Sequence, residues 1–332
     1  MTRRAWLVAT VSAAILYGAS YQQFRFFTLA DPGGATDAVH YVAMAKGERP
    51  SEPEIRHYRW VTPAAASLVM PITRQLVVDD DELGLRLAFY LVNLAFSLVA
   101  CLALFWLLQA MGFSTALGLL GVCAFASSRI TVLVTGTPLV DAGYFCAVAL
   151  LVCLTVQRRV TPLAALMPVL ILLKATTIPF LLLPLLTPLR HRWVIWVGLL
   201  AAAASFVSSG QILSNIYGDS DASYVGTLVE HAVALPHTAS RLFTWSGVYD
   251  LQNGFSLWLP LAVAGAWLNA RHRTRDVPLV VVATVPIAFG FALLSGNFGR
   301  MFFAAFPAVI SFALIAVEHV MTGPAPADAT PV

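Results

Sequence analysis

Residues 83–111 read LGLRLAFYLVNLAFSLVACLALFWLLQAM, and this stretch decides the class of fold because it is apolar almost throughout. A transmembrane helix needs roughly 20 consecutive, mostly apolar residues. Similar runs recur along the 332-residue chain, in which hydrophobic residues make up 59% and charged residues only 11%. Soluble domains carry about 25% charged residues. The sequence therefore predicts an all-α, polytopic transmembrane protein.

Eight apolar runs are predicted to be full spans, and short polar breaks separate them. They are Trp6–Phe27, Leu83–Met111, Thr115–Ser128, Asp141–Val156, Trp193–Leu213, Phe255–Ala270, Val277–Leu294 and Met301–Val317. A further run, Pro162–Leu189, is interrupted near Lys174 and Pro179. Non-helical backbone at membrane depth is tolerated only where protein or a water-filled cavity covers it. This run therefore predicts a short broken hairpin whose break lines a cavity.

Basic residues mark the breaks on one side of the predicted membrane. They are Arg3 and Arg4, Arg158 and Arg159, Arg190 and Arg192, and Arg271, Arg273 and Arg275. Because Lys and Arg are retained on the cytoplasmic side, both termini are predicted to be cytoplasmic and most acidic residues to face outside. Residues 1–320 then form one transmembrane domain with outer loops at about 30–82 and 214–254. Residues 321–332, rich in Ala and Pro, are predicted to be a disordered cytoplasmic tail.

The first outer loop carries the leading candidate residues. Asp37 precedes a segment of helical composition, so it either caps that helix or holds a carboxylate at the membrane rim. Tyr41 follows one turn later on the same face of that helix. Arg59 stands beside Trp60 and is either an interfacial anchor or a phosphate ligand, because guanidinium offers a rigid fork of donors.

Other ionisable residues lie at the edges of apolar runs. Lys174, at the tip of the broken hairpin, is costly at that depth unless it is paired, and Asp141 is the expected partner. Arg129 and Arg300 lie at outer helix ends, where they either snorkel toward water or bind phosphate. The acidic run Asp79–Glu82 is better explained as a solvated turn that favours the start of the next helix than as a metal site.

Several of these residues stand in motifs that resemble the GT-C superfamily of membrane glycosyltransferases and their bacterial relatives. The motifs are Asp37-x-x-His40-Tyr41-x-x-Met44-Ala45-x-Gly47, Tyr58-Arg59-x-x-Thr62-Pro63, Gly136-Thr137-Pro138-Leu139-Val140-Asp141, Leu173-Lys174-Ala175 and Asn297-Phe-Gly299-Arg300. Two departures stand out. Ala175 replaces a Glu that often follows the Lys, and Asp37 is alone where many members carry two adjacent acids in this loop.

The resemblance implies a GT-C-like fold and a hexosyltransferase in a bacterial cytoplasmic (inner) membrane, moving a sugar from a polyprenyl-phosphate donor to an acceptor at the outer face. Asp37 would then be the catalytic base. The substrate-binding residues would be His40, Tyr41, Arg59, Asp141, Lys174 and Arg300.

Two other functions fit the same charges. One is a transporter or flippase for a lipid-linked or anionic solute, and the other is a non-catalytic lipid-binding protein. The expected partners in each case are lipids, with the lipid-linked sugar donor first. Because the chain has no P-loop, GxGxxG or HExxH motif, no cofactor or metal ligand is assigned, although the chemistry admits a divalent metal. No basic patch with interleaved aromatics indicates nucleic acid.

Overall fold

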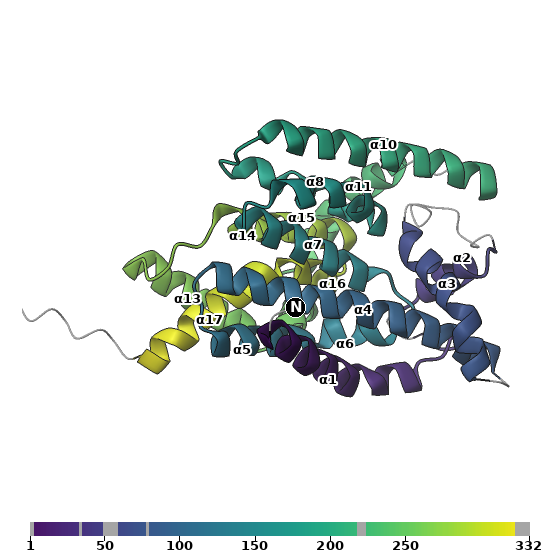
Figure 1. The fold of residues 1–332 in the computed structure, drawn as a ribbon, viewed down its shortest axis with the longest axis horizontal. Helices are drawn as coiled ribbons and strands as arrows, with labels where there is room; N and C mark the ends of the chain where they lie inside the picture. The colour runs from purple at the N-terminus through teal and green to yellow at the C-terminus, as the bar shows by residue number, and fades with distance from the viewer. Residues whose placement is uncertain (1–2, 33–34, 49–58, 78–79, 218–223, 323–332) are drawn as a thin grey trace, which may run out of the picture.

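The computed structural model describes residues 3–32, 35–48, 59–77, 80–217 and 224–322, and in them every regular element is a helix (Figure 1). This confirms the predicted all-α class. The helices are α1 (Arg3–Phe26), α2 (Ala38–Ala45), α3 (Val61–Leu76), α4 (Asp81–Ala110), α5 (Thr115–Ala126), α6 (Arg129–Gly136), α7 (Asp141–Val156), α8 (Val160–Leu173), η2 (Ala175–Thr177), α9 (Ile178–Leu181), η3 (Leu183–Leu186), α10 (Arg192–Tyr217), α11 (Tyr224–Arg241), α12 (Trp245–Phe255), α13 (Trp258–His272), α14 (Leu279–Val282), α15 (Thr284–Ser295), α16 (Phe298–Phe302), η4 (Phe303–Ala305) and α17 (Phe306–Thr322). The predicted tail lies almost wholly outside the described residues.

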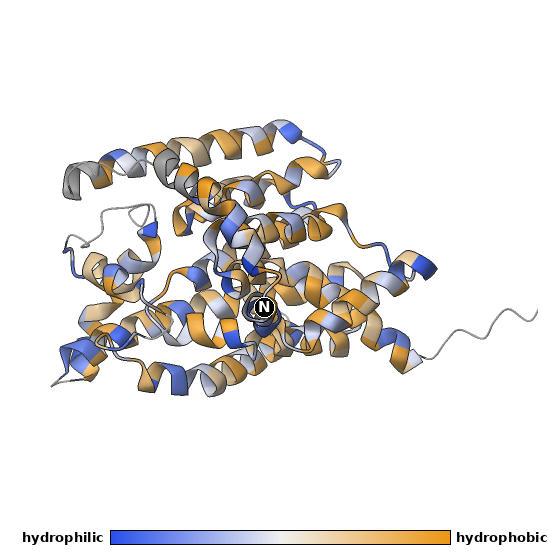
Figure 2. Ribbon diagram, turned by 180° about the vertical axis from the view of Figure 1, so that it is seen from behind, coloured by the Kyte–Doolittle hydropathy of each residue, from blue (hydrophilic) through white to orange (hydrophobic). Residues whose placement is uncertain are grey.

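Within the described residues, three helical segments are long and apolar enough to cross a membrane. They are Asp81–Ala110, Arg192–Leu213 and Phe298–Thr322. Figure 2 shows hydrophobic residues along most helices and hydrophilic ones gathered toward the ends of the bundle. The coarse prediction of membrane-spanning helices is therefore supported, whereas the expected eight full spans are not all found as single long helices.

One predicted span is bent. The run expected at Thr115–Ser128 divides into α5 and α6, whose axes differ by 58°. The break has a local cause, because Ser128 leaves the helical conformation and its Oγ accepts a hydrogen bond from the backbone N–H of Thr131 at 3.1 Å. Ser is among the residues preferred at such a cap, so the sequence starts a second helix here.

The broken hairpin is present where it was predicted. α8 ends at Leu173, Lys174 is extended, and the short helices η2, α9 and η3 lead back. α8 and α10 then begin side by side, since a Cβ on Gly198 would lie 2.8 Å from the Cα of Ala164. The chain therefore leaves and re-enters at the same end of the bundle, as the basic residues on both sides of the hairpin predicted.

Two of the predicted basic breaks, at residues 158–159 and 271–275, lie beside the C-terminal end of α4. Arg275 donates to the carbonyl of Met111, just after α4, at 3.0 Å and pairs with Glu318 of α17 at 2.6 Å. Gln157, just after α7, donates to the carbonyl of Trp106 in the last turns of α4 at 3.4 Å. Figure 1 shows the α13 and α17 ends at the left and α2 and α3 at the right. Which end is cytoplasmic remains a prediction.

The two regions predicted to be outer loops contain more helix than the sequence predicted. The region 30–82 holds α2 and also α3, which packs along the first half of α4. α3 was missed because two prolines interrupt a short run; Pro63 lies in the first helical turn, where it is tolerated, and Pro71 lies further inside. The region 214–254 holds α11 and α12. Both regions are therefore largely helical where the structure describes them.

Candidate functional site

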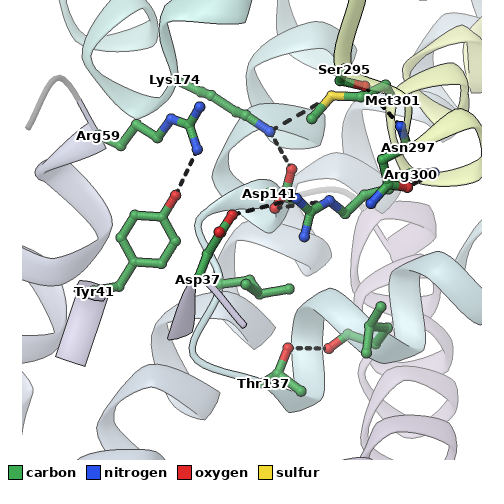
Figure 3. Close-up of polar contacts among 12 residues, drawn as sticks. Asp37, Tyr41, Arg59, Thr137, Asp141, Lys174, Ser295, Asn297, Arg300 and Met301 are labelled. Carbon is green, nitrogen blue, oxygen red and sulfur yellow. Dashed lines mark hydrogen bonds and ion pairs between the residues drawn. The ribbon is translucent and has the colours of Figure 1, made fainter. Parts of the chain in front are cut away.

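Six of the seven candidate residues lie around one point, although they are spread over most of the chain (Figure 3). Asp37 precedes α2, Tyr41 is on α2, Arg59 precedes α3, Asp141 begins α7, Lys174 follows α8, and Arg300 is in α16. We call Asp37, Asp141, Lys174 and Arg300 the charge cluster. Tyr41 and Arg59 lie beside it. The seventh candidate, His40, is buried on α2 with 8% of its surface exposed.

Lys174 and Asp141 form the innermost part of the charge cluster. The Lys174 Nζ lies 2.5 Å from Asp141 Oδ1, and the two side chains are 0% and 3% exposed. Lys174 Nζ also lies 3.9 Å from the sulfur of Met301 and 5.1 Å from the centre of the Tyr144 ring. The pairing predicted from the cost of a buried lysine is thus confirmed.

A buried asparagine holds Asp141 in position. The side-chain amide of Asn93, in the middle of α4, donates to the carbonyls of Thr137 at 2.9 Å and Leu139 at 3.0 Å. These carbonyls belong to the turn that leads into α7. Asn93 was not among the candidates, although a single amide within an apolar run is a signal of a buried polar contact.

Arg300 joins the two carboxylates. Its Nη2 lies 3.5 Å from Asp37 Oδ2 and its Nε lies 4.0 Å from Asp141 Oδ2. Asn297 fixes the start of α16, because its side-chain oxygen accepts from the backbone N–H of Arg300 at 3.2 Å. The Asn297-Phe-Gly-Arg300 motif is therefore a helix cap that points the arginine at the charge cluster.

Asp37 does not act as a helix cap. It occupies the position before α2 but its own backbone is helical, with φ −65° and ψ −16°, and its side chain makes no capping hydrogen bond. The carboxylate instead reaches Arg300. The capping interpretation is therefore wrong. The Asp37 carboxylate belongs to the charge cluster instead.

Arg59 and Tyr41 form a second polar contact next to the charge cluster. Arg59 Nη1 donates to the Tyr41 hydroxyl at 2.8 Å. Burial raises the pKa of Tyr41, so its phenol stays protonated at neutral pH. The Nε atoms of Arg59 and Arg300 are buried and have no hydrogen-bond partner in the described part of the chain. Orphaned buried donors are rare in proteins, so these two arginines are unusual in this respect.

A cavity of about 440 Å³ opens on the other side of Arg300. We call it the arginine pocket, because Arg129, Arg241 and Arg300 line it together with Asp250, Asn253 and Asn297. Gly296 and Gly299 also line the arginine pocket. Gly299 allows a close approach, because a Cβ there would lie 2.4 Å from the carbonyl oxygen of Asp250. With three cations against one carboxylate, the arginine pocket is suited to an anion such as phosphate.

Arg241 was not predicted as a site residue. It ends α11, an amphipathic helix in the region predicted as the second outer loop, and sequence alone gives no sign that this helix packs against α15. Arg129 had been weighed as a phosphate ligand, and its place in the arginine pocket is compatible with that role.

An apolar cavity of about 450 Å³ lies beside the broken hairpin. Ile178 and Pro179 of the returning arm line one side, and Pro286, Gly290 and Leu294 of α15 line the other. Ser295, the next residue after Leu294, lines the arginine pocket. The expected cavity at the hairpin break is thus present, and α15 runs from it to the arginine pocket.

The described residues contain no group of three or more His, Cys, Asp or Glu side chains arranged to hold a metal ion. We therefore assign no residue to a metal.

Comparisons with known proteins add no relative. No family model matches this sequence, and no curated protein or solved structure shows significant similarity to it.

Proposed function

We propose that this protein is a membrane glycosyltransferase that moves a sugar from a polyprenyl-phosphate donor to an acceptor hydroxyl at the outer face. The observation that carries the proposal is the position of Arg300, which contacts Asp37 and Asp141 and also lines the arginine pocket. A phosphate in that pocket would lie next to a carboxylate, which is the arrangement that glycosyl transfer from a lipid phosphate needs.

The two carboxylates have different environments and so different roles. Asp141 is buried against Lys174 at 2.5 Å, which commits it to that ion pair. The Asp37 side chain is 19% exposed and its contact with Arg300 is longer, at 3.5 Å. We therefore assign Asp37 as the general base and Asp141 as the residue that positions Lys174 and Arg300.

In the proposed step the acceptor oxygen forms a bond to the anomeric carbon while the bond from that carbon to the phosphate oxygen breaks. The acceptor proton passes to Asp37, and the phosphate leaves with the bonding electron pair. Positioned cations that meet charge as it develops are a major source of catalysis. Arg300, Arg241 and Arg129 would meet that charge, and Arg59 would act next to them through its contact with Tyr41.

The apolar cavity supports a lipid-linked donor. It lies between the broken hairpin and α15, next to the arginine pocket, so a polyprenyl chain there would place its phosphate among the arginines.

Asn93, which holds the Asp141 turn, is 17 residues before the end of α4 at Ala110, or about 25 Å along the helix axis. In a hydrocarbon layer about 30 Å thick, the reaction would take place near the outer rim.

We also propose a finer topology. The α5–α6 pair, the α14–α15–α17 region and the other apolar helices would form a GT-C-like arrangement of about eight spans plus the broken hairpin. The basic end then faces the cytoplasm of a bacterial cell, with both termini on that side, by the retention of Lys and Arg there.

One rival function has a specific observation in its favour. A helix broken inside the apolar part of the bundle, with buried Lys174 at the break, also suits a transporter or flippase. The two functions differ in products, because only a transferase releases free polyprenyl phosphate and a glycosylated acceptor.

The proposal is tested by mass spectrometry of lipids that co-purify with the protein. A polyprenyl phosphate or its glycoside is expected with the wild type and with Asp37→Asn, but it should be reduced at least about tenfold in Arg241→Gln, since two or more charge-assisted hydrogen bonds are lost. Arg271→Gln, at the opposite end of the bundle, is the matched control. Absence of any polyprenyl lipid, or equal retention in Arg241→Gln, would contradict the proposal.

A further inference from the structure

A groove of about 390 Å³ runs between α4 and α7, outside the charge cluster and both cavities described above. Val99 and Trp106 of α4 line one side, Leu150 and Leu154 of α7 line the other, and Arg159 stands at one end. The lining positions on each helix recur at three- to four-residue spacing, so each helix contributes one continuous apolar stripe. The groove therefore runs along the two helices.

The groove opens outward from the bundle. Val99 is 39% exposed, and Trp106, Leu150 and Leu154 are half-buried. From Val99 to Trp106 the groove follows seven residues of helix, or about 10 Å, which matches part of one extended hydrocarbon chain. In a membrane this opening would face lipid.

The end of the groove at Gln157 and Arg159 is polar and basic. Gln157 donates to the carbonyl of Trp106 at 3.4 Å, which ties the two helix ends together. Arg158 has φ 56°, a left-handed conformation that is uncommon outside glycine, and this sharp turn brings the exposed Arg159 back to the mouth of the groove. Arg159 makes no ion pair within the described residues, so its charge is available to an outside anion.

We propose that this groove binds one acyl chain of a phospholipid with an anionic headgroup, whose phosphate pairs with Arg159. Three observations converge on this ligand. The stripe is apolar over its length, and among the described residues that line it the one charged side chain is a cation at one end. That end lies beside the basic breaks at residues 158–159 and 271–275. Basic pockets between transmembrane helices on the cytoplasmic side are suited to anionic headgroups.

Trp106 fits the same ligand. Its ring forms part of the groove next to the basic end, and Trp is favoured at the level of lipid headgroups because one edge is polar and the rest apolar. The proposed lipid site lies further toward the C-terminal end of α4 than Asn93, which holds the Asp141 turn. It shares no residue with the charge cluster, so it does not depend on the proposed glycosyl transfer.

The experiment uses the full-length protein reconstituted in nanodiscs of phosphatidylglycerol and phosphatidylcholine at equal amounts, followed by native mass spectrometry of the released protein. The wild type is expected to retain one phosphatidylglycerol, with a preference over phosphatidylcholine of about fivefold, because one basic side chain near an anionic surface is worth ~1 kcal/mol. Arg159→Gln should abolish that preference.

Two further variants separate charge from shape. Val99→Trp adds bulk at the exposed rim of the groove and should lower retention of both lipids without unfolding the protein. Arg192→Gln, an exposed arginine at the same end of the bundle but outside the groove, should behave as the wild type. Thermal unfolding in detergent is recorded for each variant to show that all are folded.

Equal retention of both lipids by the wild type would overturn the proposal, as would an unchanged preference in Arg159→Gln. Retention of polyprenyl phosphate in place of phosphatidylglycerol, when both are supplied, would also overturn it and would assign the groove to the donor lipid.

Discussion

The Lys174–Asp141 pair gives the sharpest prediction about stability. Both side chains are almost fully buried, at 0% and 3% exposure, so solvent screens neither charge when its partner is removed. Removing one member of a buried pair costs about 3–5 kcal/mol because an uncompensated charge is left behind. Lys174→Met leaves Asp141 with Arg300 at 4.0 Å, which places the expected loss at the low end, about 3 kcal/mol.

Asp141→Asn is expected to cost more. Within the described residues Lys174 has no other carboxylate partner, only the Met301 sulfur and the Tyr144 ring. The loss should therefore approach ~5 kcal/mol. In the double variant neither charge is left unpaired, so its cost should be at least ~2 kcal/mol below the sum of the single losses.

Equilibrium unfolding in mixed micelles, with the free energy of unfolding as the readout, tests this cycle. Thr155→Val is the matched control, since Thr155 is buried on the same helix but bonds only the carbonyl of Leu151; it should cost less than ~1 kcal/mol. The reasoning is refuted if Lys174→Met is as stable as wild type, or if the two single losses simply add.

Three other predictions concern separate parts of the molecule. Tyr41→Phe removes the acceptor of the Arg59 hydrogen bond at 2.8 Å. Titration with the sugar donor should show about tenfold weaker binding, a loss of ~1.4 kcal/mol for one charge-assisted bond, and unchanged affinity would show that this contact is not part of the site. Arg275→Lys loses the two parallel bonds to its carboxylate partner and should lower the free energy of unfolding by about 1–3 kcal/mol, whereas an equal unfolding midpoint would show that the clasp is not stabilising. Cysteines placed at exposed Thr36 and Thr274 should be labelled from outside intact cells at position 36 only, and labelling of position 274 would reverse the proposed topology.

The sequence was sufficient for the parts of the site in which physics leaves few choices. A lysine within an apolar hairpin requires a partner, and Asp141 was the suggested one; the contact of 2.5 Å confirms this pairing. Asp37 and Arg300, which are far apart in sequence, were each assigned to the site by the resemblance of their motifs, and the structure places their side chains 3.5 Å apart.

Other features depend on packing that local patterns do not encode. Arg241 ends a surface-like amphipathic helix, and only the contact of α11 with α15 brings it to the arginine pocket. α3 contains two prolines and lies between polar segments, so hydropathy alone placed it in a loop. The bend at Ser128 arises from one capping hydrogen bond inside an otherwise continuous apolar run.

The central claim is that Asp37 removes a proton during sugar transfer, and turnover by Asp37→Asn measures it most directly. The substitution keeps the size of the side chain and a hydrogen-bond acceptor for Arg300 but removes the basic carboxylate. With purified protein, a polyprenyl-phosphate sugar and an acceptor, release of polyprenyl phosphate should fall about 10²- to 10⁴-fold, the usual contribution of a general base, while the amount of bound donor stays unchanged. Turnover equal to that of the wild type, with donor bound to the same extent, would contradict the account.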